Sequence, residues 1–224
     1  MRTLGSGGMA IVVDAPDREN EGDLVIAAEH ASAEAIAFMA RHGRGLICAA
    51  MPAERLDALR VPMMSRRGRD PHGTAFYVSV NRRDRRGHGV SAGERAATIR
   101  ALADPERGAD DFESPGHVFP LEARPGGVLE RPGHTEAVVE LARRAGCAPV
   151  GAICEVMAED GSMLRLPGLL ALAAKHGLPV LAISDLRASL SLRRSPSPRE
   201  AVLSVGTAAD LPRVYDRVAH GPCG

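Results

Sequence analysis

The segment that most constrains the fold is Arg18–Asp23, a charged stretch between two apolar runs. The first run is Ile11–Val13 and the second is Leu24–Ala28, and their aliphatic and β-branched residues predict two strands. If the backbone stays extended through the charged stretch, carboxylates two residues apart project from one face. Such a set of oxygen atoms suits a divalent cation such as Mg²⁺, although a solvated acidic loop between two strands has the same pattern. The carboxylates concerned are Glu19, Glu21 and Asp23.

Composition argues against several classes of function. The chain has 224 residues with 28 basic and 28 acidic side chains, so it has no positive excess for a nucleic-acid backbone. No apolar run approaches the roughly 18–20 residues of a membrane helix, and the first residues lack the apolar core of a signal peptide. The four cysteines show no CxxC spacing, which argues against a zinc knuckle or a redox pair. We therefore expect a cytoplasmic enzyme without a nucleic-acid or membrane partner.

Strand and helix patterns alternate along the chain, and some neighbouring strands look antiparallel. This alternation predicts an α+β fold, a single layered domain with a mixed sheet and flanking helices. Serines and a capping box begin two of the helices, and glycines end three of them. The expected strands are Ala10–Val13, Leu24–Ala28, Gly45–Ala50, Thr74–Val80, His117–Leu121, Val150–Met157 and Pro179–Ser184. The expected helices are Ser32–Arg41, Glu54–Leu59, Ser91–Ala103, Thr135–Arg144 and Pro167–Gly177.

Polar segments without a period separate these elements. Pro62–Gly73, Asn81–Gly89 and Asp104–Gly116 are expected to be connections. From about Leu190 the chain is rich in serine, proline and arginine and has little pattern. We therefore expect a domain over residues 1–189 and a flexible or loosely docked tail over residues 190–224.

A second polar cluster begins one predicted helix. Arg131, Pro132 and Gly133 come just before His134 and Thr135. The free N–H groups and the positive end of a helix dipole attract anions, and an arginine fork beside them suits phosphate. A histidine in this place also has a simpler role as a helix cap or a surface group.

Two further residues have the chemistry for proton transfer. His117 lies between a glycine turn and a predicted strand, where a general acid or base and an edge-strand histidine are both reasonable. Glu155 interrupts an otherwise apolar strand, and a charged residue in such a place is seldom buried without a partner. We therefore expect Glu155 to face a ligand, a metal ion or an arginine.

A series of motifs with these residues occurs in a fixed order along the chain. They are Asp17–Leu24, Arg41–Gly43, Gly89–Ala92, Arg95–Ile99, Pro115–Leu121, Gly127–Leu129, Gly133–Glu136 and Cys154–Glu155. In this order they resemble the 3,4-dihydroxy-2-butanone 4-phosphate synthases of riboflavin biosynthesis. The resemblance extends from about Val12 to Leu186, which is most of the chain.

The resemblance implies a fold, an activity and a partner. Members of this family are α+β homodimers whose sites lie near the subunit interface. They convert D-ribulose 5-phosphate into L-3,4-dihydroxy-2-butanone 4-phosphate and formate, in a reaction that depends on Mg²⁺ or Mn²⁺, with two ions per site. We therefore expect a metal-dependent lyase that acts on ribulose 5-phosphate as a homodimer.

The family's site residues carry over to matching positions of this chain. Glu19 and His134 are implied as the metal ligands. The residues implied in proton transfer are His117, Glu155, Asp23 and Glu21. The sugar phosphate is expected to contact Arg18, Glu19, Asp23, Arg131, Pro132, Gly133, His134, Thr135 and Glu155.

The sequence departs from the family pattern at four places. Between Asp14 and Asp17, Ala15-Pro16 replaces acidic residues, and Gly87-His88 replaces a pair of threonines that approach the substrate in the family. A helix before the first strand is expected to be missing, because only about eight residues precede Met9. The residues after 189 do not resemble the GTP cyclohydrolase II module of many relatives, so we expect a monofunctional chain.

These departures leave two alternatives beside the synthase. One is a divergent paralogue that acts on another sugar phosphate. The other is a non-catalytic dimeric homologue that binds a sugar phosphate or a protein partner. A complete set of metal and phosphate positions favours the synthase over both.

Overall fold

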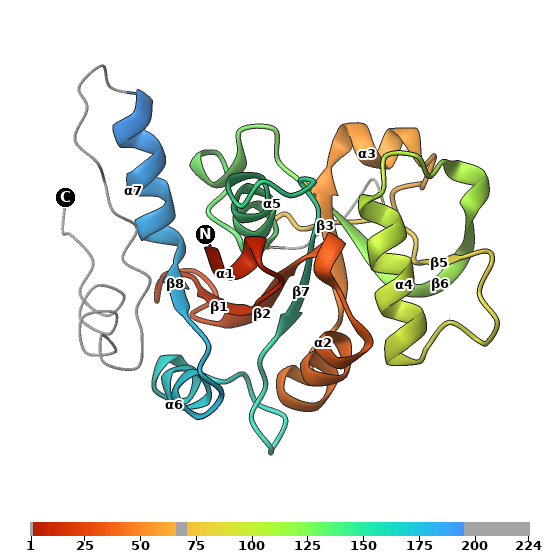
Figure 1. Ribbon diagram of the computed structural model, residues 1–224. Coiled ribbons are helices and arrows are strands. Elements are labelled where there is room, and N and C mark those ends of the chain that lie inside the picture. The colour runs from red at the N-terminus through yellow and green to blue at the C-terminus, as the bar shows by residue number, and fades with distance from the viewer. Residues whose placement is uncertain (1, 66–70, 195–224) are drawn as a thin grey trace.

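The computed structural model describes residues 2–65 and 71–194 (Figure 1). Its strands are β1 (Ala10–Val13), β2 (Gly22–Ala27), β3 (Cys48–Pro52), β4 (Ala75–Phe76), β5 (Val80–Arg82), β6 (Phe112–Ala123), β7 (Gly151–Glu155) and β8 (Val180–Ala182). In the described part of the chain they form one eight-stranded sheet in the order β4-β6-β3-β7-β2-β1-β8, with β5 paired to β6. β1 with β8 and β3 with β6 are parallel, and the other pairs are antiparallel. The sheet is therefore mixed, as the sequence predicts.

Helices flank this sheet on both faces (Figure 1). The α-helices are α1 (Arg2–Gly5), α2 (Ala33–Phe38), α3 (Ala53–Ala58), α4 (Ala92–Ala103), α5 (His134–Arg144), α6 (Leu166–His176) and α7 (Ile183–Arg194). Shorter turns are η1 (Ala28–His30), η2 (Met39–Gly43), η3 (Ala109–Asp111) and η4 (Gly127–Leu129). Within the described ranges, no helix combines the length and the apolar character needed to cross a membrane.

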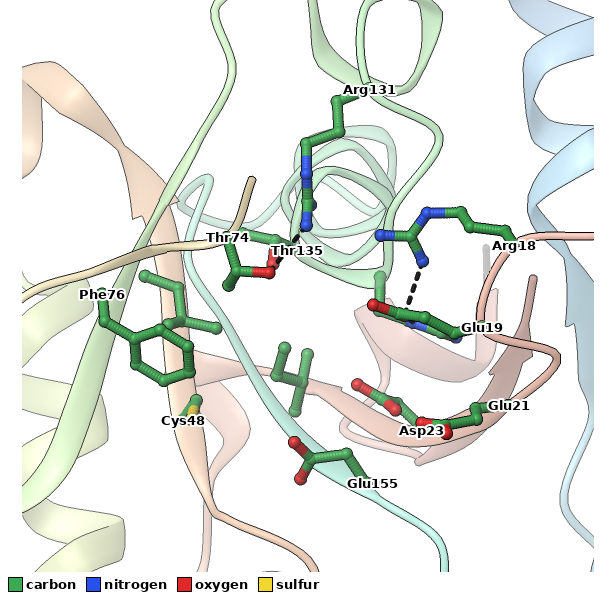
Figure 2. Close-up of a pocket in the computed structure, with 13 residues that line it drawn as sticks. Arg18, Glu19, Glu21, Asp23, Cys48, Thr74, Phe76, Arg131, Thr135 and Glu155 are labelled. Atoms are coloured by element: carbon green, nitrogen blue, oxygen red, sulfur yellow. Dashed lines mark hydrogen bonds and ion pairs between the residues drawn. The ribbon is translucent and has the colours of Figure 1, made fainter. Parts of the chain in front are cut away.

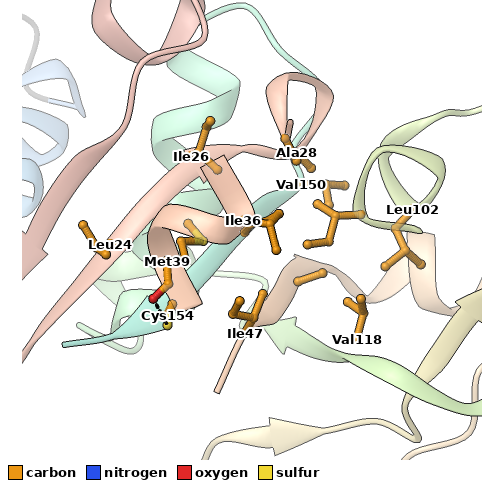
Figure 3. Packing of buried hydrophobic residues seen from close by; sticks show 14 of the residues in the cluster. Leu24, Ile26, Ala28, Ile36, Met39, Ile47, Leu102, Val118, Val150 and Cys154 are labelled. Atoms are coloured by element: carbon orange, nitrogen blue, oxygen red, sulfur yellow. Dashed lines mark hydrogen bonds between the residues drawn. The ribbon is translucent and has the colours of Figure 1, made fainter. Parts of the chain in front are cut away.

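The central strands are buried on both faces, which explains why they are apolar throughout. In β1, Ile11 and Val13 belong to a hydrophobic cluster that includes residues of α2, α4 and α6, whereas Ala10 and Val12 belong to a second cluster that includes residues of α5 and α7. Figure 3 shows part of the first of these two clusters. A strand that separates two hydrophobic clusters must be apolar at every position. The predicted single layered α+β domain with a mixed sheet and flanking helices is confirmed.

Local signals located several elements correctly. The first strand has the predicted bounds, and α4 begins at the Ser91 cap, whose hydroxyl accepts the Glu94 N–H at 3.3 Å. The Ser32 hydroxyl caps α2 in the same way, at 3.1 Å from the Ala35 nitrogen. α5 and α6 end near glycines with positive φ, as the sequence predicts.

Other boundaries differ because tertiary contacts override local pattern. The connection predicted over Asp104–Gly116 is wrong in its second half, because β6 already begins at Phe112 and pairs with β5 there. Thr74–Val80 is not one strand, since β4 and β5 divide it. The expected helix Ser32–Arg41 leaves α-geometry after Phe38 and continues as the π-turn η2.

The predicted domain over residues 1–189 has a helix at each of its ends. The single turn α1 precedes β1, and its Leu4 is buried. At the other end, α7 continues to Arg194, beyond the predicted boundary at residue 189, and Ser189 within it is buried. The rest of the predicted tail lies outside the described residues.

Candidate functional site

Asp14 organises the loop between β1 and β2. Its side chain is fully buried directly after the last residue of β1. One carboxylate oxygen accepts the backbone N–H of Glu21 at 2.8 Å. The other oxygen accepts the N–H of Glu19 at 3.0 Å and the Arg18 guanidinium at 2.9 Å. This single carboxylate therefore fixes the positions of both glutamates, through the kind of charge-assisted bond that is strongest in proteins.

The loop is a turn rather than the extended strand that the spacing predicts. The Arg18 N–H bonds the carbonyl of the third residue before it at 3.0 Å, and Pro16 occupies the second position of this turn, which proline favours. Asn20 has φ of 55°, a conformation that asparagine tolerates. β2 starts only at Gly22, so the alternation argument is wrong for Glu19. The carboxylates converge because the turn folds back.

A cavity of about 210 Å³ lies between this loop, the sheet and the N-terminus of α5 (Figure 2). Polar side chains from the loop, β2, β7 and α5 face apolar side chains from β3, β4, β6 and β7 across it. The lining residues are Arg18, Glu19, Glu21, Asp23, Cys48, Thr74, Phe76, Leu121, Arg131, His134, Thr135, Ile153 and Glu155. The three acids of the charged segment therefore surround one cavity.

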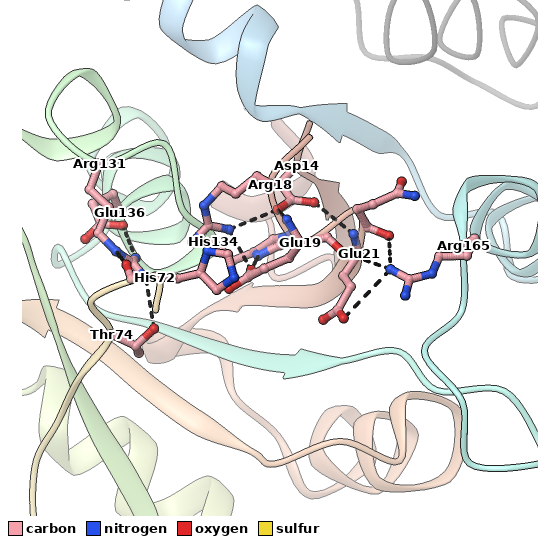
Figure 4. A network of polar contacts seen from close by, with 11 residues as sticks. Asp14, Arg18, Glu19, Glu21, His72, Thr74, Arg131, His134, Glu136 and Arg165 are labelled. Atoms are coloured by element: carbon pink, nitrogen blue, oxygen red, sulfur yellow. Dashed lines mark hydrogen bonds and ion pairs between the residues drawn. The ribbon is translucent and has the colours of Figure 1, made fainter. Parts of the chain in front are cut away.

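Glu19 and His134 form an ion pair beside the cavity (Figure 4). His134 Nδ1 lies 3.5 Å from Glu19 Oε2, which also accepts the Arg18 guanidinium at 2.6 Å. The hydrogen bond to His134 is the main cause that lowers the pKa of Glu19 to about 2, against the opposing effect of burial. Burial also disfavours a charged imidazole, but the carboxylates of Asp23, Glu19 and Asp14 outweigh it and raise the pKa of this histidine to about 9.

The second ring nitrogen of His134 indicates a ligand. His134 Nε2 is buried and has no hydrogen-bond partner among the described residues, which is rare for a buried polar atom. One atom each of His134, Glu19 and Asp14 lie within 4.8 Å of one another, close enough to surround a metal ion. Because the loop already engages both oxygens of Asp14, Glu19 and His134 are the better ligands.

Asp23 and Glu155 lie opposite each other in the β2–β7 register. A Glu155 oxygen accepts the Leu46 N–H at 2.8 Å, and the close approach is possible because Gly45 has no side chain. Burial raises the pKa of Asp23 to about 7; the His134 charge opposes this rise and the Glu155 charge adds to it. A carboxyl group with a pKa near neutrality is suited to both accepting and returning a proton.

Arg131 is held beside the N-terminus of α5 by three partners (Figure 4). Its guanidinium donates to a Glu136 oxygen at 2.7 Å, to the Thr74 hydroxyl at 2.8 Å and to the His72 carbonyl at 2.8 Å. The cap residue of α5 is Gly133, where a Cβ would lie only 2.3 Å from an Arg131 nitrogen. The cavity therefore faces an uncapped helix N-terminus beside a fixed positive charge, an arrangement that suits phosphate.

Some predicted site residues lie apart from this cavity. His117 is exposed in β6, where its backbone N–H and its Nδ1 lie 2.9 and 3.2 Å from the side-chain oxygen of Asn81. Gly89 also packs against Asn81, so the Gly87-His88 pair lies near His117 and not in the cavity wall. Pro132 borders a neighbouring cavity instead.

Several functional residues were missed by sequence reasoning. Asp14 had a usable signal, because it is the first polar residue after the buried run of β1. Arg165 had none, although it donates to the carbonyls of Glu19 at 2.8 Å and Asn20 at 2.6 Å. The other missed residues come from separate elements that only the fold brings together. They are Cys48, Thr74, Phe76, Leu121 and Ile153.

Comparison with known proteins identifies one family. The family profile described as 3,4-dihydroxy-2-butanone 4-phosphate synthase matches residues 1–189. A protein of that name from Agrobacterium fabrum is 51% identical over 186 residues, which cover 83% of this chain and 87% of the relative. The riboflavin biosynthesis protein RibBA of Aquifex aeolicus is 54% identical over 182 residues, which cover 80% of this chain. The chain spans 45% of that longer relative.

A solved structure has the same fold. It is described as 3,4-dihydroxy-2-butanone 4-phosphate synthase in complex with two magnesium ions. The TM-score is 0.81 at 43% sequence identity, and the match covers 85% of this chain and 94% of the other.

Proposed function

This chain belongs to the 3,4-dihydroxy-2-butanone 4-phosphate synthase family, and from that premise we propose that it converts D-ribulose 5-phosphate into L-3,4-dihydroxy-2-butanone 4-phosphate and formate. The observation that carries the proposal is one cavity that combines Glu19 and His134 with the N-terminus of α5. Acids and an imidazole suit a divalent cation, and the helix N-terminus suits a phosphate. The product would enter riboflavin biosynthesis.

The residues of this cavity fit a magnesium or manganese cofactor. Glu19 and His134 would hold it, since the carboxylate is ionised and the buried Nε2 has no other partner among the described residues. We propose two ions per site, by analogy with the solved relative that contains two magnesium ions. When bound, the cofactor supplies Lewis acidity that stabilises negative charge on the substrate oxygens.

Asp23 and Glu155 are the proposed proton carriers. The reaction removes a proton beside a ketone, expels water and later returns protons, so it needs groups that titrate near neutral pH. Asp23 meets this requirement with its pKa of about 7. Glu155 lies opposite it in register, and Glu21, whose pKa is raised by burial and then by the charge of Glu19, is a supporting acid.

The phosphate group of the substrate takes no part in bond changes, so its contacts serve for positioning. We propose that it binds at Thr135 and the free N–H groups of the first turn of α5. The guanidinium of Arg131 adds a positive charge whose place is fixed by Glu136 and Thr74. This anchoring would direct the sugar carbons toward Glu19 and Asp23.

A homodimer would explain the position of His117. In one chain this residue is exposed and lies outside the cavity, beside Asn81 and the loop at Gly89. A catalytic histidine must contact the substrate, so His117 can act only if a second copy brings it to the cavity of its neighbour. We therefore propose a homodimer with the site near the interface.

The direct test is formate release from ribulose 5-phosphate by purified full-length protein with Mg²⁺. We expect formate to accumulate with the wild-type chain and to fall to background with Glu19→Gln. Asp17→Asn, an exposed acid of the same loop, is the matched control and should retain activity. Wild-type formate release no greater than that of Glu19→Gln would reject the proposed function.

A further inference from the structure

A second group of metal-binding side chains lies apart from the cavity. Glu29, His30 and Cys147 each offer one ligand atom, and these atoms lie within 4.8 Å of one another. The Cys147 sulfur is 3.8 Å from His30 Nε2. Neither the proposed reaction nor any motif of the sequence analysis uses these residues.

The backbone fixes Cys147. Gly146 has φ of 82° after the end of α5, and its N–H bonds the Arg143 carbonyl at 3.1 Å. The Cys147 N–H bonds the Ala142 carbonyl at 3.1 Å. This pair of bonds is a Schellman motif, which holds the residue after the left-handed glycine in one place.

The backbone also fixes the other two residues relative to Cys147. Glu29 and His30 belong to the turn η1, which the Ala31 N–H closes by bonding the Ala28 carbonyl at 3.1 Å. The Ala28 N–H bonds the Val150 carbonyl at 2.9 Å, three residues after Cys147. The two segments are therefore joined beside the cluster, and the ligand atoms need little rearrangement to meet an ion.

The geometry matches a zinc-type ion. In a tetrahedral site with Zn–S of about 2.3 Å and Zn–N of about 2.0–2.1 Å, sulfur and nitrogen lie about 3.6 Å apart. The observed separation of 3.8 Å is close to this value. The thiolate is the ligand that distinguishes this cluster from the cavity, because sulfur favours Zn²⁺ or Co²⁺ over Mg²⁺, which prefers oxygen ligands.

We propose that Glu29, His30 and Cys147 form a second metal site for a thiophilic divalent cation of the zinc class, with water as the fourth ligand. The site would link the C-terminal end of β2 to the C-terminal end of α5, two elements whose N-terminal ends line the cavity. β2 carries Asp23 near its start and leads into η1, and α5 carries His134 in its first turn and ends just before Cys147. An eleven-residue helix is about 16 Å long, so this ion would lie well away from the catalytic one.

Cobalt absorption tests the proposal without any measurement of activity. Full-length protein, stripped of metal and kept reduced by a phosphine, is titrated with Co²⁺ in a large excess of Mg²⁺. A thiolate bound to Co²⁺ gives a near-ultraviolet charge-transfer band, which carboxylate and imidazole ligands do not give. We expect this band to appear with one equivalent of Co²⁺ and to disappear when Zn²⁺ is added.

Variants assign the band to one cysteine. Cys147→Ala should abolish it, whereas Cys48→Ala, which removes the thiol of the catalytic cavity, and Cys223→Ala should retain it. His30→Ala keeps the thiol and should weaken Zn²⁺ binding at least tenfold. If circular dichroism shows that Cys147→Ala is unfolded, the Zn²⁺ affinity of His30→Ala tests the site instead. Absence of the band in the wild-type protein, its persistence in Cys147→Ala, or unchanged Zn²⁺ affinity in His30→Ala would overturn the proposal.

Discussion

At the scale of single residues, the cavity depends on charges that balance one another. Asp14, Glu19 and Asp23 bring negative charge into a small volume, and Arg18 and His134 compensate for it. The balance moves the pKa values of Glu19 and His134 in opposite directions, as an ion pair requires. A cation bound here would neutralise part of the negative charge that the His134 imidazolium neutralises in its absence.

Asp14→Asn tests the role of Asp14 as a positioning residue. An amide cannot accept all three bonds that the carboxylate accepts, so the loop should loosen and move Glu19. We expect a loss of about 1–3 kcal/mol in the free energy of unfolding and weaker Mg²⁺ binding. Urea denaturation and calorimetry measure the two effects, and Asp17→Asn is the matched control. Equal stability and Mg²⁺ affinity in the two variants would contradict this role.

The raised pKa of His134 predicts how stability depends on pH. Folding raises this pKa from 6.5 to about 9, so the stabilisation is complete below pH 6.5 and is lost as the pH rises through 9. Without divalent cations, we expect the free energy of unfolding to fall by about 3 kcal/mol over this range, at about 1.4 kcal/mol per pKa unit. The raised pKa of Asp23 also lowers the free energy of unfolding as the pH rises, between pH 3.8 and about 7.

Urea denaturation in a chelator, at a series of pH values, measures this fall. His134→Gln should flatten the curve above pH 6.5, and the exposed His88→Gln should not change it. Saturating Mg²⁺ should also reduce the fall, because metal binding takes the place of the proton. A curve for His134→Gln that follows the wild type would show that other groups control the pH dependence.

At the scale of elements, the site depends on where α5 and β2 begin. The N-terminus of α5 reaches the cavity because Gly133 lets the chain pass close to Arg131. β2 begins at Gly22, directly after the loop that Asp14 holds, and Asp23, the second residue of this strand, lines the cavity. Both starts are set by glycines at close contacts rather than by the hydrophobic pattern.

Gly133→Ala should disturb the N-terminus of α5. The added Cβ would lie 2.3 Å from an Arg131 nitrogen and 2.8 Å from a Glu136 oxygen, so the side chains of Arg131 and Glu136 must move away from it. We expect KM for ribulose 5-phosphate to rise about tenfold, which corresponds to about 1.4 kcal/mol of binding free energy, with a smaller change in kcat. Steady-state formate kinetics measure both constants.

Gly93→Ala is the matched control in the first turn of α4. The nearest atom to its Cβ would be the Ala33 Cβ at 3.8 Å, an ordinary contact. Because alanine is the better helix former, we expect this variant to keep its KM and to gain about 0.5–1 kcal/mol of stability. A similar change in KM in both variants would mean that the α5 N-terminus has no special role in binding.

At the scale of the whole molecule, not all of the eleven predicted site residues line the cavity. Eight of them surround the cavity, among them Glu19, Asp23 and His134. His117 lies beyond the cavity with Asn81 and Gly89. If His117 takes part in catalysis, its separation from the cavity means that the active unit must contain more than one chain.

Mixed dimers test this argument. Chains with Glu19→Ala and chains with His117→Ala, each inactive alone, are co-expressed with different tags, and the mixed species is isolated. If each site takes His117 from the partner, one of the two sites is intact, so we expect about half of the wild-type formate release. Mixed dimers as inactive as their parents, or a monomer by sedimentation, would contradict the dimeric site.

The sequence alone determined the class of fold, the start of α4, the ends of α5 and α6, and the identity of most cavity residues. These follow from short-range causes, namely apolar runs, caps and left-handed glycines, and from motifs that keep their order along the chain. Only the tertiary structure decided that Glu19 reaches the cavity through a turn, that Asp14 and Arg165 hold that turn, and that His117 lies elsewhere. These outcomes depend on contacts such as Arg165 with Glu19, which join segments far apart in the chain and leave no local pattern.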